Sequence, residues 1–511
     1  MKNTLLLLFT AGVIFIVTIV FSAGHAVSGP EVSAQVFVDF TRVVGNVARL
    51  SGVQGSPFPT VKHDVVKTRL FRDCSIELSR FPQDCYPNTL TLAGIFPDAV
   101  ANPDDPGSYH FEAIDRHIRA AKDAGSDILW QSSYDIGMSD SWVDANLGGK
   151  APCDLARWGR VVTKCLQHFN NRWAGGIDHS VKFVEFVNEP LGLGGYRGRG
   201  REAISAFIHF LKTIERYNSI HPDTRVEAAG PGVPHSFDTW TETKRMFSVL
   251  LDEVRKEKAE LPVFTFHTYG KDTSPLSNAR LAKEIRALLD EKGFTRTRLW
   301  NSEWQAGDHI KAMIPDRFNP RGHNSAEERS LFNLAAATYA LSCKARWQGI
   351  LDGSCYYRAD LRAFPDEIER KLHVENMEAA ILFPPDSRVT PLAMQEKLMK
   401  NLRKDTPERC YCRNSPDDSS FTCLACRSTG GDTLTLLLCN LSFQKRSCNI
   451  RARFPEGDRT EAYVFLLSSL EGRSREERVA LKDGASSEKL CEVSVPPLDS
   501  ALLLYKTKSP R

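Results

Sequence analysis

The stretch Val181-Lys182-Phe183-Val184-Glu185-Phe186-Val187-Asn188-Glu189-Pro190 joins an apolar run to a polar end. Its β-branched and aromatic residues predict a strand over Val181–Val187, and Pro190 stops regular structure just beyond it. A second stretch, Thr297-Arg298-Leu299-Trp300-Asn301-Ser302-Glu303-Trp304, has the same order of parts, with a strand predicted over Arg298–Ser302. Each strand leads into a glutamate, Glu189 after the first and Glu303 after the second.

Segments that resemble strands and segments that resemble helices alternate from residue 60 to residue 360. The predicted strands are Val66–Phe71, Asp127–Ser132, Val181–Val187, Arg225–Ala229, Val263–Tyr269, Arg298–Ser302 and Ser354–Tyr357. The predicted helices are Phe111–Ala124, Leu155–Trp173, Arg201–Asn218, Phe237–Lys256, Asn278–Lys292 and Ala326–Lys344. Such alternation is typical of βα units in a parallel sheet. Roughly seven repeats favour an α/β fold of the (β/α)8 TIM-barrel type. We place the barrel at residues 42–385, with the missing first strand near residues 44–55.

The composition changes after about residue 385, where short β-rich runs are separated by turn residues. These runs are Phe421–Arg427, Thr433–Ser442, Cys448–Phe454, Thr460–Leu467, Leu490–Val495 and Ala501–Lys506. Gly430-Gly431-Asp432 is a good hairpin turn between the first two. The pattern predicts an antiparallel β-sandwich at residues 386–511, to which residues 31–41 add a strand over Gln35–Thr41.

The first 26 residues form an apolar leader. No charged residue or histidine follows Lys2 until His25, and residues 5–21 are almost wholly apolar. A cleaved signal peptide needs an apolar core of roughly 7–15 residues and a membrane-spanning helix about 20. The segment lies between the two, so a cleaved signal and a retained signal-anchor both stay open. Either one predicts a secreted, lumenal or extracellular protein whose only membrane contact is this helix.

Cysteine usage agrees with an oxidising compartment, because the chain has 13 cysteines. Three close couples predict local disulfides, namely Cys74 with Cys85, Cys153 with Cys165, and Cys343 with Cys355. Seven more lie between Cys410 and Cys491, where Cys410-Tyr411-Cys412 and Cys423-Leu424-Ala425-Cys426 resemble a zinc site. Disulfides suit an exported protein better, and an odd number leaves one thiol free or paired between chains. Asn440-Leu441-Ser442 is the only Asn-X-Ser/Thr acceptor and predicts a glycan on Asn440.

The overall composition limits the classes of partner and cofactor that we expect for this protein. With 42% hydrophobic residues, 25% charged residues and a net charge of +3, the chain is an ordinary globular protein. Such a weak positive charge gives no reason to expect nucleic acid as a partner. The histidines show no clustered ligand spacing and no glycine-rich phosphate loop is present, so we expect neither a metal nor an organic cofactor.

Glu189 and Glu303 are the candidate catalytic residues. In a TIM barrel, functional side chains gather at the carboxyl ends of the strands, and strands four and seven would bring the two glutamates into one mouth. Two carboxyl groups about 5–5.5 Å apart hydrolyse a glycoside with retention of configuration. Glu303 would attack the anomeric carbon, while its negative charge keeps the proton on Glu189, the acid and later the base. The alternative for each glutamate is a solvated or ion-paired carboxylate at a strand end.

Several other residues are candidates for binding a sugar. Asn188 suits a 2-hydroxyl group, and His267 or Tyr269, at the end of the sixth strand, could orient the nucleophile. The further candidates are Trp300, Trp304 and Tyr356 for stacking, with core packing as the alternative, and Arg69 and Asp73 at the end of the second predicted strand. The loop with Arg197, Arg199 and Arg201 would suit a carboxylate or sulfate, or else is a solvated loop.

Several motifs together resemble glycoside hydrolase family 39. They are Ile95–Asp98, Asn102–Phe111, Trp158, Phe169–Trp173, Phe186–Pro190 and Gly230–Gly232. The resemblance covers most of residues 35–385 and implies Glu189 as acid/base and Glu303 as nucleophile. The family includes β-xylosidases and α-L-iduronidases. The chain departs from the family at Arg69-Leu70-Phe71-Arg72-Asp73, which lacks the usual histidine after the arginine, and at Val187, where an aromatic residue is usual.

The leading hypothesis is therefore a retaining glycoside hydrolase acting on a carbohydrate, such as a β-xyloside, a uronide or a related glycoside. A transglycosylase that uses the same two glutamates stays open, because water and a sugar hydroxyl compete for one intermediate. A non-catalytic carbohydrate-binding protein on an enzyme scaffold is the alternative from a different class.

Overall fold

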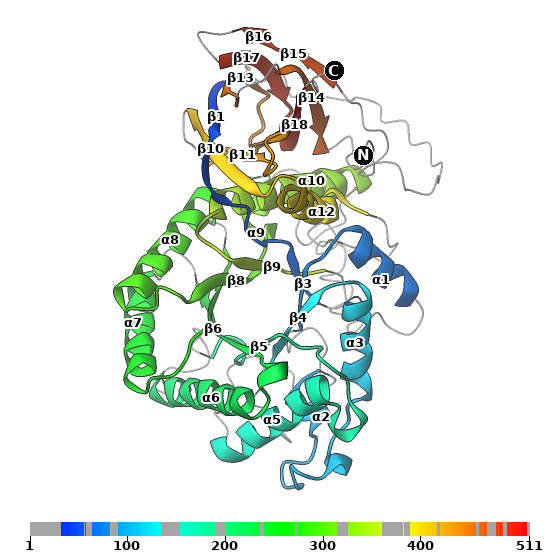
Figure 1. The fold of residues 1–511 in the computed structure, drawn as a ribbon, viewed down its shortest axis with the longest axis vertical. Coiled ribbons are helices and arrows are strands. Elements are labelled where there is room, and N and C mark those ends of the chain that lie inside the picture. Colours follow the sequence, from blue (N-terminus) through cyan, green and yellow to red (C-terminus); the bar gives the residue numbers. More distant parts are fainter. Residues whose placement is uncertain are drawn as a thin grey trace.

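The computed structural model describes residues 32–55, 57, 64–81, 90–133, 154–190, 200–235, 240–270, 273–313, 325–359, 382, 389–415, 419–455, 459–467, 477–483 and 488–507. These residues form a closed parallel barrel and a separate ten-stranded sheet (Figure 1). The apolar leader of residues 1–26 lies outside them. Within these ranges no helix is long and apolar enough to cross a membrane.

The barrel closes as predicted. Its strands in order are β2 (Gly52–Gln54), β3 (Leu78–Phe81), β4 (Asp127–Gln131), β5 (Phe183–Glu185), β6 (Glu227–His235), β7 (Val263–Thr268), β8 (Arg298–Trp304) and β9 (Gly353–Tyr356). Every neighbouring pair is parallel, and Val53 on β2 meets Tyr356 on β9 to close the ring. The first strand lies within residues 44–55, and β5 and β8 are strands four and seven, as the sequence predicts.

Helices surround the barrel on the outside (Figure 1). They are α1 (Asp64–Asp73), α2 (Leu92–Ile95), α3 (Glu112–Asp123), α5 (Leu155–Asn171), α6 (Gly200–Ile220), α7 (Trp240–Lys256), α8 (Pro275–Glu291), α9 (Gly307–Met313) and α10 (Ala326–Trp347). All six predicted helices are confirmed to within a few residues. Inside the ring a layer of side chains fills the floor, formed by Leu78, Leu129, Phe183, Ala229, Val263, Trp300 and Cys355. The barrel interior is thus packed below the level of the two glutamates.

The predicted strand over Val66–Phe71 is wrong, because this segment lies in helix α1. Leu70, Phe71 and Cys74 are buried, whereas Arg69 and Asp73 are exposed, and this spacing is helical. The second barrel strand is β3, whose sequence Leu78-Ser79-Arg80-Phe81 contains two buried polar residues, of which Arg80 points into the site. The departure from the family pattern at Arg69–Asp73 therefore does not concern the second barrel strand.

The second sheet forms a small sandwich of its own. Its strands are β1 (Val32–Asn46), β10 (Glu408–Ser415), β11 (Phe421–Arg427), β12 (Thr433–Asn440), β13 (Arg446–Arg453), β14 (Arg459–Leu466), β15 (Glu477–Ala480), β16 (Lys482–Asp483), β17 (Glu488–Val495) and β18 (Asp499–Thr507). The sheet folds around an apolar core in which Phe40, Phe454 and Tyr505 contact one another. Strand β1 joins this sheet between β10 and β13 as predicted, although its pairing with β13 is parallel.

Helices α10 and α12 (Pro391–Asp405) lie between the barrel and the sandwich (Figure 1). Thr338 on α10 donates a hydrogen bond to the carbonyl of Leu498 at 3.0 Å, and the Arg346 guanidinium donates to the carbonyl of Phe421 at 3.0 Å. Leu392 and Met399 on α12 belong to the same apolar core as the barrel. The junction is therefore a packed, hydrogen-bonded interface.

Two predicted covalent modifications are contradicted. Cys343 and Cys355 are free thiols on opposite sides of the barrel wall, since Cys355 lies in the inner layer and Cys343 accepts a hydrogen bond from Asn278 on α8 at 3.8 Å. Asn440 is fully buried on β12, and its Nδ2 donates to the carbonyls of Gln444 and Pro496 at 2.8 and 2.9 Å. A glycan on that nitrogen would have no space.

The remaining cysteine predictions have two outcomes. All seven cysteines from Cys410 to Cys491 are free thiols in the structure, which contains none of the disulfides predicted there. Five of these side chains, on strands β10 to β13 and β17, are buried in the two apolar cores, where a thiol acts as a small hydrophobic group. Cys74 and Cys165 are buried thiols, and their predicted partners Cys85 and Cys153 lie outside the described residues.

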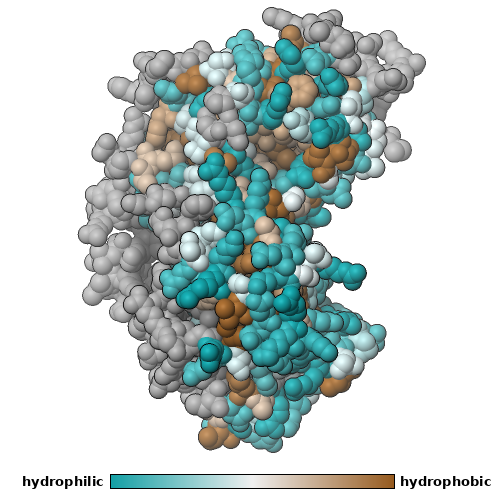
Figure 2. All heavy atoms as spheres, turned by 90° about the vertical axis from the view of Figure 1, so that its left-hand side faces the viewer, coloured by the Kyte–Doolittle hydropathy of each residue, from teal (hydrophilic) through white to brown (hydrophobic). Residues whose placement is uncertain are grey.

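The side of the molecule formed by α7 and α8 is mainly hydrophilic (Figure 2). Hydrophobic atoms occur there only in small separate groups among the residues that carry colour. This face of the described chain therefore offers no large apolar area for a membrane or an obligate partner.

Candidate active site

The two glutamates meet at the carboxyl end of the barrel. Glu189 follows β5, and Glu303 is the penultimate residue of β8. Trp300 points into the barrel, so strict alternation along β8 would turn Glu303 outward. A register shift between β7 and β8 prevents this, because Phe266 pairs with Asn301 and the next residue, His267, pairs with Glu303. The extra residue Ser302 is a β-bulge that directs the Glu303 side chain into the site.

The carboxyl groups lie close enough to act on one bond. One carboxylate oxygen of Glu189, one of Glu303 and a ring nitrogen of His267 all lie within 4.8 Å of one another. The Glu303 side chain is 8% exposed and the Glu189 side chain 28% exposed, so water reaches Glu189 more readily. Such a spacing leaves no room for a water molecule between the first carboxylate and a sugar, as an inverting mechanism requires.

Each oxygen of Glu303 has its own donor. The Tyr269 hydroxyl donates to Oε1, and Nη1 of Arg80 donates to Oε2 at 2.5 Å. Burial raises the pKa of Tyr269 well above its ordinary value, and the negative charge of Glu303 raises it further. Tyr269 therefore stays protonated and donates. The sequence left Tyr269 and His267 as alternatives for this contact, and the structure gives it to Tyr269.

Arg80, on β3, is the centre of a buried polar network that the sequence did not reveal. Its Nε donates to Glu185 Oε2 at 2.6 Å, and its Nη2 donates to Asn188 Oδ1 at 3.0 Å. Burial lowers the pKa of Arg80, but Glu185 and Glu303 outweigh it and raise that pKa above its ordinary value. The guanidinium is therefore a permanent positive charge, and neither it nor Glu185 is exposed.

Asn188 has a fixed orientation in this network. Its Oδ1 accepts hydrogen bonds from Arg80 Nη2 at 3.0 Å and from Gln131 Nε2 at 3.1 Å. Arginine can only donate, so the carbonyl oxygen must face it and the NH2 group is directed away. The amide is thus oriented to donate to a hydroxyl group, which is the role that the sequence predicted.

Glu189 is held by His267 and by its own backbone. The ring nitrogen Nδ1 of His267 lies 2.8 Å from Glu189 Oε1, and Nε2 lies 3.4 Å from Arg80 Nη2. Because Arg80 donates, Nε2 is the acceptor and Nδ1 carries the proton that is donated to Glu189. Glu189 has a φ of 48°, and its N–H donates to the carbonyl of Gly232 at 3.1 Å. A left-handed glutamate is strained, and such strain is common where a side chain must be aimed.

Five predicted binding residues lie outside the site. Arg69 and Asp73 form an exposed ion pair on α1, with N–O distance 3.4 Å. Trp300 packs below the site against Phe183, and Trp304 and Tyr356 pack against each other on the outer side of the barrel wall. For these three aromatic residues the alternative of core packing is the correct one. Tyr357, one residue after β9, instead lies beside Tyr269 with ring centroids 6.1 Å apart.

Glu189, His267 and Glu303 would also suit a metal ion by residue type and spacing. The position next to them is already taken by a cation, because Arg80 contacts Glu303 at 2.5 Å and lies 3.4 Å from His267. A second positive charge beside a buried guanidinium would be strongly repelled. The arrangement therefore fits acid and nucleophile chemistry better than metal binding.

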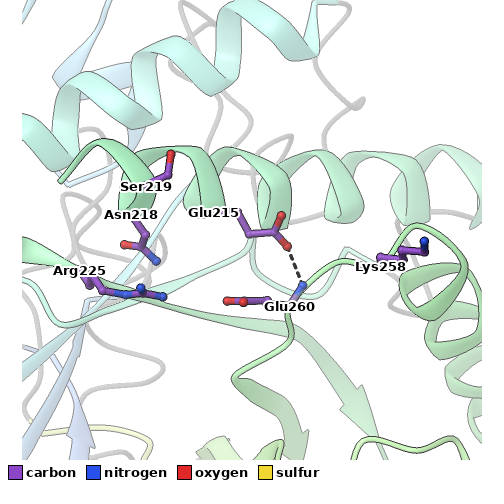
Figure 3. Close-up of a pocket in the computed structure, with 6 residues that line it drawn as sticks. All are labelled: Glu215, Asn218, Ser219, Arg225, Lys258 and Glu260. Carbon is purple, nitrogen blue, oxygen red and sulfur yellow. Dashed lines mark hydrogen bonds between the residues drawn. The ribbon is translucent and has the colours of Figure 1, made fainter. Parts of the chain in front are cut away.

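A hollow lies at the end of the barrel opposite the two glutamates (Figure 3). It is lined by Glu215, Asn218, Ser219, Arg225, Lys258 and Glu260. These residues come from the end of α6 and from the segments that lead into β6 and β7, so they lie at the amino ends of the strands. Glu215 accepts a hydrogen bond from the backbone N–H of Glu260 at 2.6 Å. In TIM barrels this end serves stability, and we assign the hollow no catalytic role.

Comparison with solved structures finds the same two-part fold. A glucosidase from Croceicoccus marinus gives a TM-score of 0.66 at 19% identity, covering 94% of this chain and 100% of that chain. A GH39 enzyme from Xanthomonas axonopodis pv. citri gives 0.63 at 15% identity, covering 94% and 98%. A monomeric β-xylosidase from Caulobacter crescentus gives 0.62 at 15% identity, covering 93% and 100%. No protein-family model and no curated protein sequence matches the chain. At such low identity these likenesses show that the chain has the barrel-and-sandwich fold of these proteins.

Proposed function

We propose that this protein is a retaining glycoside hydrolase with Glu303 as nucleophile and Glu189 as acid/base. The observation that carries the proposal is the geometry of the pair, whose nearest oxygens lie within 4.8 Å at the carboxyl end of the barrel strands. Carboxyl groups so close are those of a double-displacement mechanism. The structures with the same fold include a glucosidase and a β-xylosidase, which supports the same class of reaction.

In the first step Glu303 would attack the anomeric carbon while Glu189 protonates the departing oxygen. Tyr269 and Arg80 hold the Glu303 carboxylate in place through one oxygen each, so little reorganisation is needed as its charge moves to the new bond. The NH2 group of Asn188 would donate to the sugar 2-hydroxyl, a contact that strengthens in the transition state. A covalent glycosyl-enzyme results.

In the second step Glu189, now without its proton, would take a proton from water that attacks the same carbon. Its 28% exposed side chain gives that water access. His267 donates to Glu189 throughout and keeps the carboxyl group directed at the bond. The sugar leaves with its original configuration because it has been inverted twice.

The substrate proposal is coarser. We propose a β-xyloside, a uronide or a related glycoside as the substrate, and the structures with the same fold include a β-xylosidase and an arabinofuranosidase. Residues 191–199, which contain two of the three loop arginines considered for a charged sugar, lie outside the described residues.

The test is hydrolysis of aryl glycosides by the purified protein. The panel would contain a β-xyloside, a β-glucoside, a β-galactoside, an α-L-arabinoside and an α-L-iduronide. We expect turnover of at least one member, its loss in Glu303→Ala, and partial recovery of Glu189→Ala by azide, which attacks the intermediate without base help. Glycan binding without turnover by any folded preparation would favour a non-catalytic carbohydrate-binding protein. Transfer to sugar acceptors in preference to water would favour a transglycosylase.

A further inference from the structure

A third carboxylate lies directly below the catalytic pair. Glu185, the last residue of β5, is four positions before Glu189 and points into the barrel. Its side chain is fully buried, with Oε2 bonded to Arg80 at 2.6 Å and to Gln131 at 3.2 Å. The proposed mechanism gives Glu189 and Glu303 their roles and leaves Glu185 without one.

A contribution to the stability of the fold is a weak explanation for a buried carboxylate at Glu185. A buried carboxylate loses its hydration, and buried ion pairs are often no more stabilising than apolar residues of the same size. Burial raises the pKa of Glu185, yet the charge of Arg80 outweighs it and lowers that pKa below the ordinary value. Glu185 is therefore ionised, and a costly charge is kept at this position.

The hydrogen bonds of Arg80 show what this charge does. Nε is occupied by Glu185 alone, whereas Nη1 donates to Glu303 and Gln54, and Nη2 donates to Asn188 and lies 3.4 Å from His267 Nε2. Glu185 thus fixes the rotation of the guanidinium, and the guanidinium positions the nucleophile and the amide. Without Glu185, the whole charge of Arg80 would be opposed by Glu303 alone, and a carboxylate held so tightly attacks less readily.

We propose that Glu185 is a positioning residue that acts through Arg80, sharing its positive charge so that Glu303 stays nucleophilic and Glu189 keeps its proton. With Glu185 and Glu303 ionised beside one arginine, the cluster carries a net charge of −1 before Glu189 is counted. Removal of the Glu185 carboxylate therefore changes the charge that both catalytic carboxyl groups face. The inference rests on the proposed glycosidase function.

The consequence is a shift of the pH–rate profile. In Glu185→Gln the shape is kept but the charge is lost, so Glu303 and Glu189 both lose their protons at lower pH. The acid limb of kcat/KM reports the nucleophile and the basic limb reports the acid. Both limbs are expected to move to lower pH by about one unit, the smaller end of the effect of a neighbouring charge. At the wild-type optimum this one-unit move lowers kcat/KM by at most about four-fold, so the positions of the two limbs are the readout.

A matched control separates charge from packing. Glu77 is also a buried carboxylate paired with an arginine, Arg403, but it lies just before β3 at the opposite end of the barrel. Glu77→Gln is expected to leave both limbs in place. Glu185→Asp keeps the charge with a shorter side chain, so it is expected to lower kcat with both limbs at their wild-type positions. This variant also carries the test if Glu185→Gln does not fold.

The experiment is the pH dependence of kcat/KM for wild type, Glu185→Gln, Glu185→Asp and Glu77→Gln on the best aryl glycoside. A fall in rate for Glu185→Gln with unmoved limbs would overturn the proposal, since that result defines a purely structural residue. Moved limbs in Glu185→Asp would overturn it as well. If folded wild-type protein hydrolyses no glycoside, the proposed function itself fails and this inference with it. If the wild-type protein is active, the results for the variants test only the role proposed for Glu185.

Discussion

Replacing Arg80 with methionine removes a buried cation that two carboxylates share. Arg80 contacts Glu185 at 2.6 Å and Glu303 at 2.5 Å, and the guanidinium is completely buried. Removing one partner of such a pair leaves a buried charge without compensation and costs about 3–5 kcal/mol. Because two carboxylates lose their partner together, we expect Arg80→Met to lower the free energy of unfolding of the barrel by about 4 kcal/mol or more.

Arg69→Met is a matched control on the same part of the chain. Arg69 pairs with Asp73 at 3.4 Å, but the two side chains are 63% and 52% exposed. Exposed pairs of this kind contribute about 0.2–1 kcal/mol. The two substitutions remove the same side chain, so a difference of several kcal/mol between them measures burial and pairing.

Urea denaturation followed by tryptophan fluorescence is the assay. All eight tryptophans precede residue 348, so their emission reports on the barrel and not on the sandwich. In the double variant Arg80→Met with Glu185→Gln, one of the two unpaired carboxylates is gone. We expect this variant to recover about 1–2 kcal/mol relative to Arg80→Met alone. A loss below about 1 kcal/mol for Arg80→Met, or strict additivity in the double variant, would refute this reasoning.

Three further predictions follow from the contacts. Tyr269→Phe removes the hydroxyl that donates to Glu303, and since a hydrogen bond to a charged group contributes about 1.5–3 kcal/mol, kcat/KM should fall about ten- to hundred-fold in steady-state assays. Burial, aided by the charge of Arg116, lowers the pKa of His117 to about 3, so its folded form stays neutral where the unfolded chain takes up a proton. Stability is then lost as the pH falls below about 6.5, and His117→Gln should lose about 2 kcal/mol less between pH 7 and pH 5 in urea titrations. The buried thiols of Cys343 and Cys355 should react with maleimide only after unfolding, and recovery of a disulfide-linked peptide pair by mass spectrometry would contradict this.

Much of the fold follows from the sequence because most strands are apolar runs with clear ends. The stretches that end in Glu189 and Glu303 identify strands four and seven. In the helices between the strands, apolar residues recur about every 3.6 positions. Strand β3 was not predicted because it is not an apolar run with clear ends. Leu78-Ser79-Arg80-Phe81 is short and half polar, and its Arg80 belongs to the site. The helix at Asp64–Asp73 contains two adjacent valines, which favour a strand by residue type.

The site was only partly predictable for related reasons. Glu189, Glu303, Asn188 and Tyr269 lie at strand ends, where a local pattern exposes them. Arg80 and Glu185 become neighbours only when the barrel closes, because they are 105 positions apart in the chain. The β-bulge at Ser302 decides that Glu303 points inward and Trp304 outward, and no alternation in the sequence signals a bulge.

The central claim is that two carboxyl groups this close hydrolyse a glycoside with retention of configuration. Proton NMR of the first product formed from the best aryl glycoside, recorded before mutarotation, tests that claim directly. The account predicts that the released sugar first has the same anomeric configuration as the substrate. Release of the opposite anomer would contradict it, because a single displacement by water requires carboxyl groups about 6.5–9.5 Å apart.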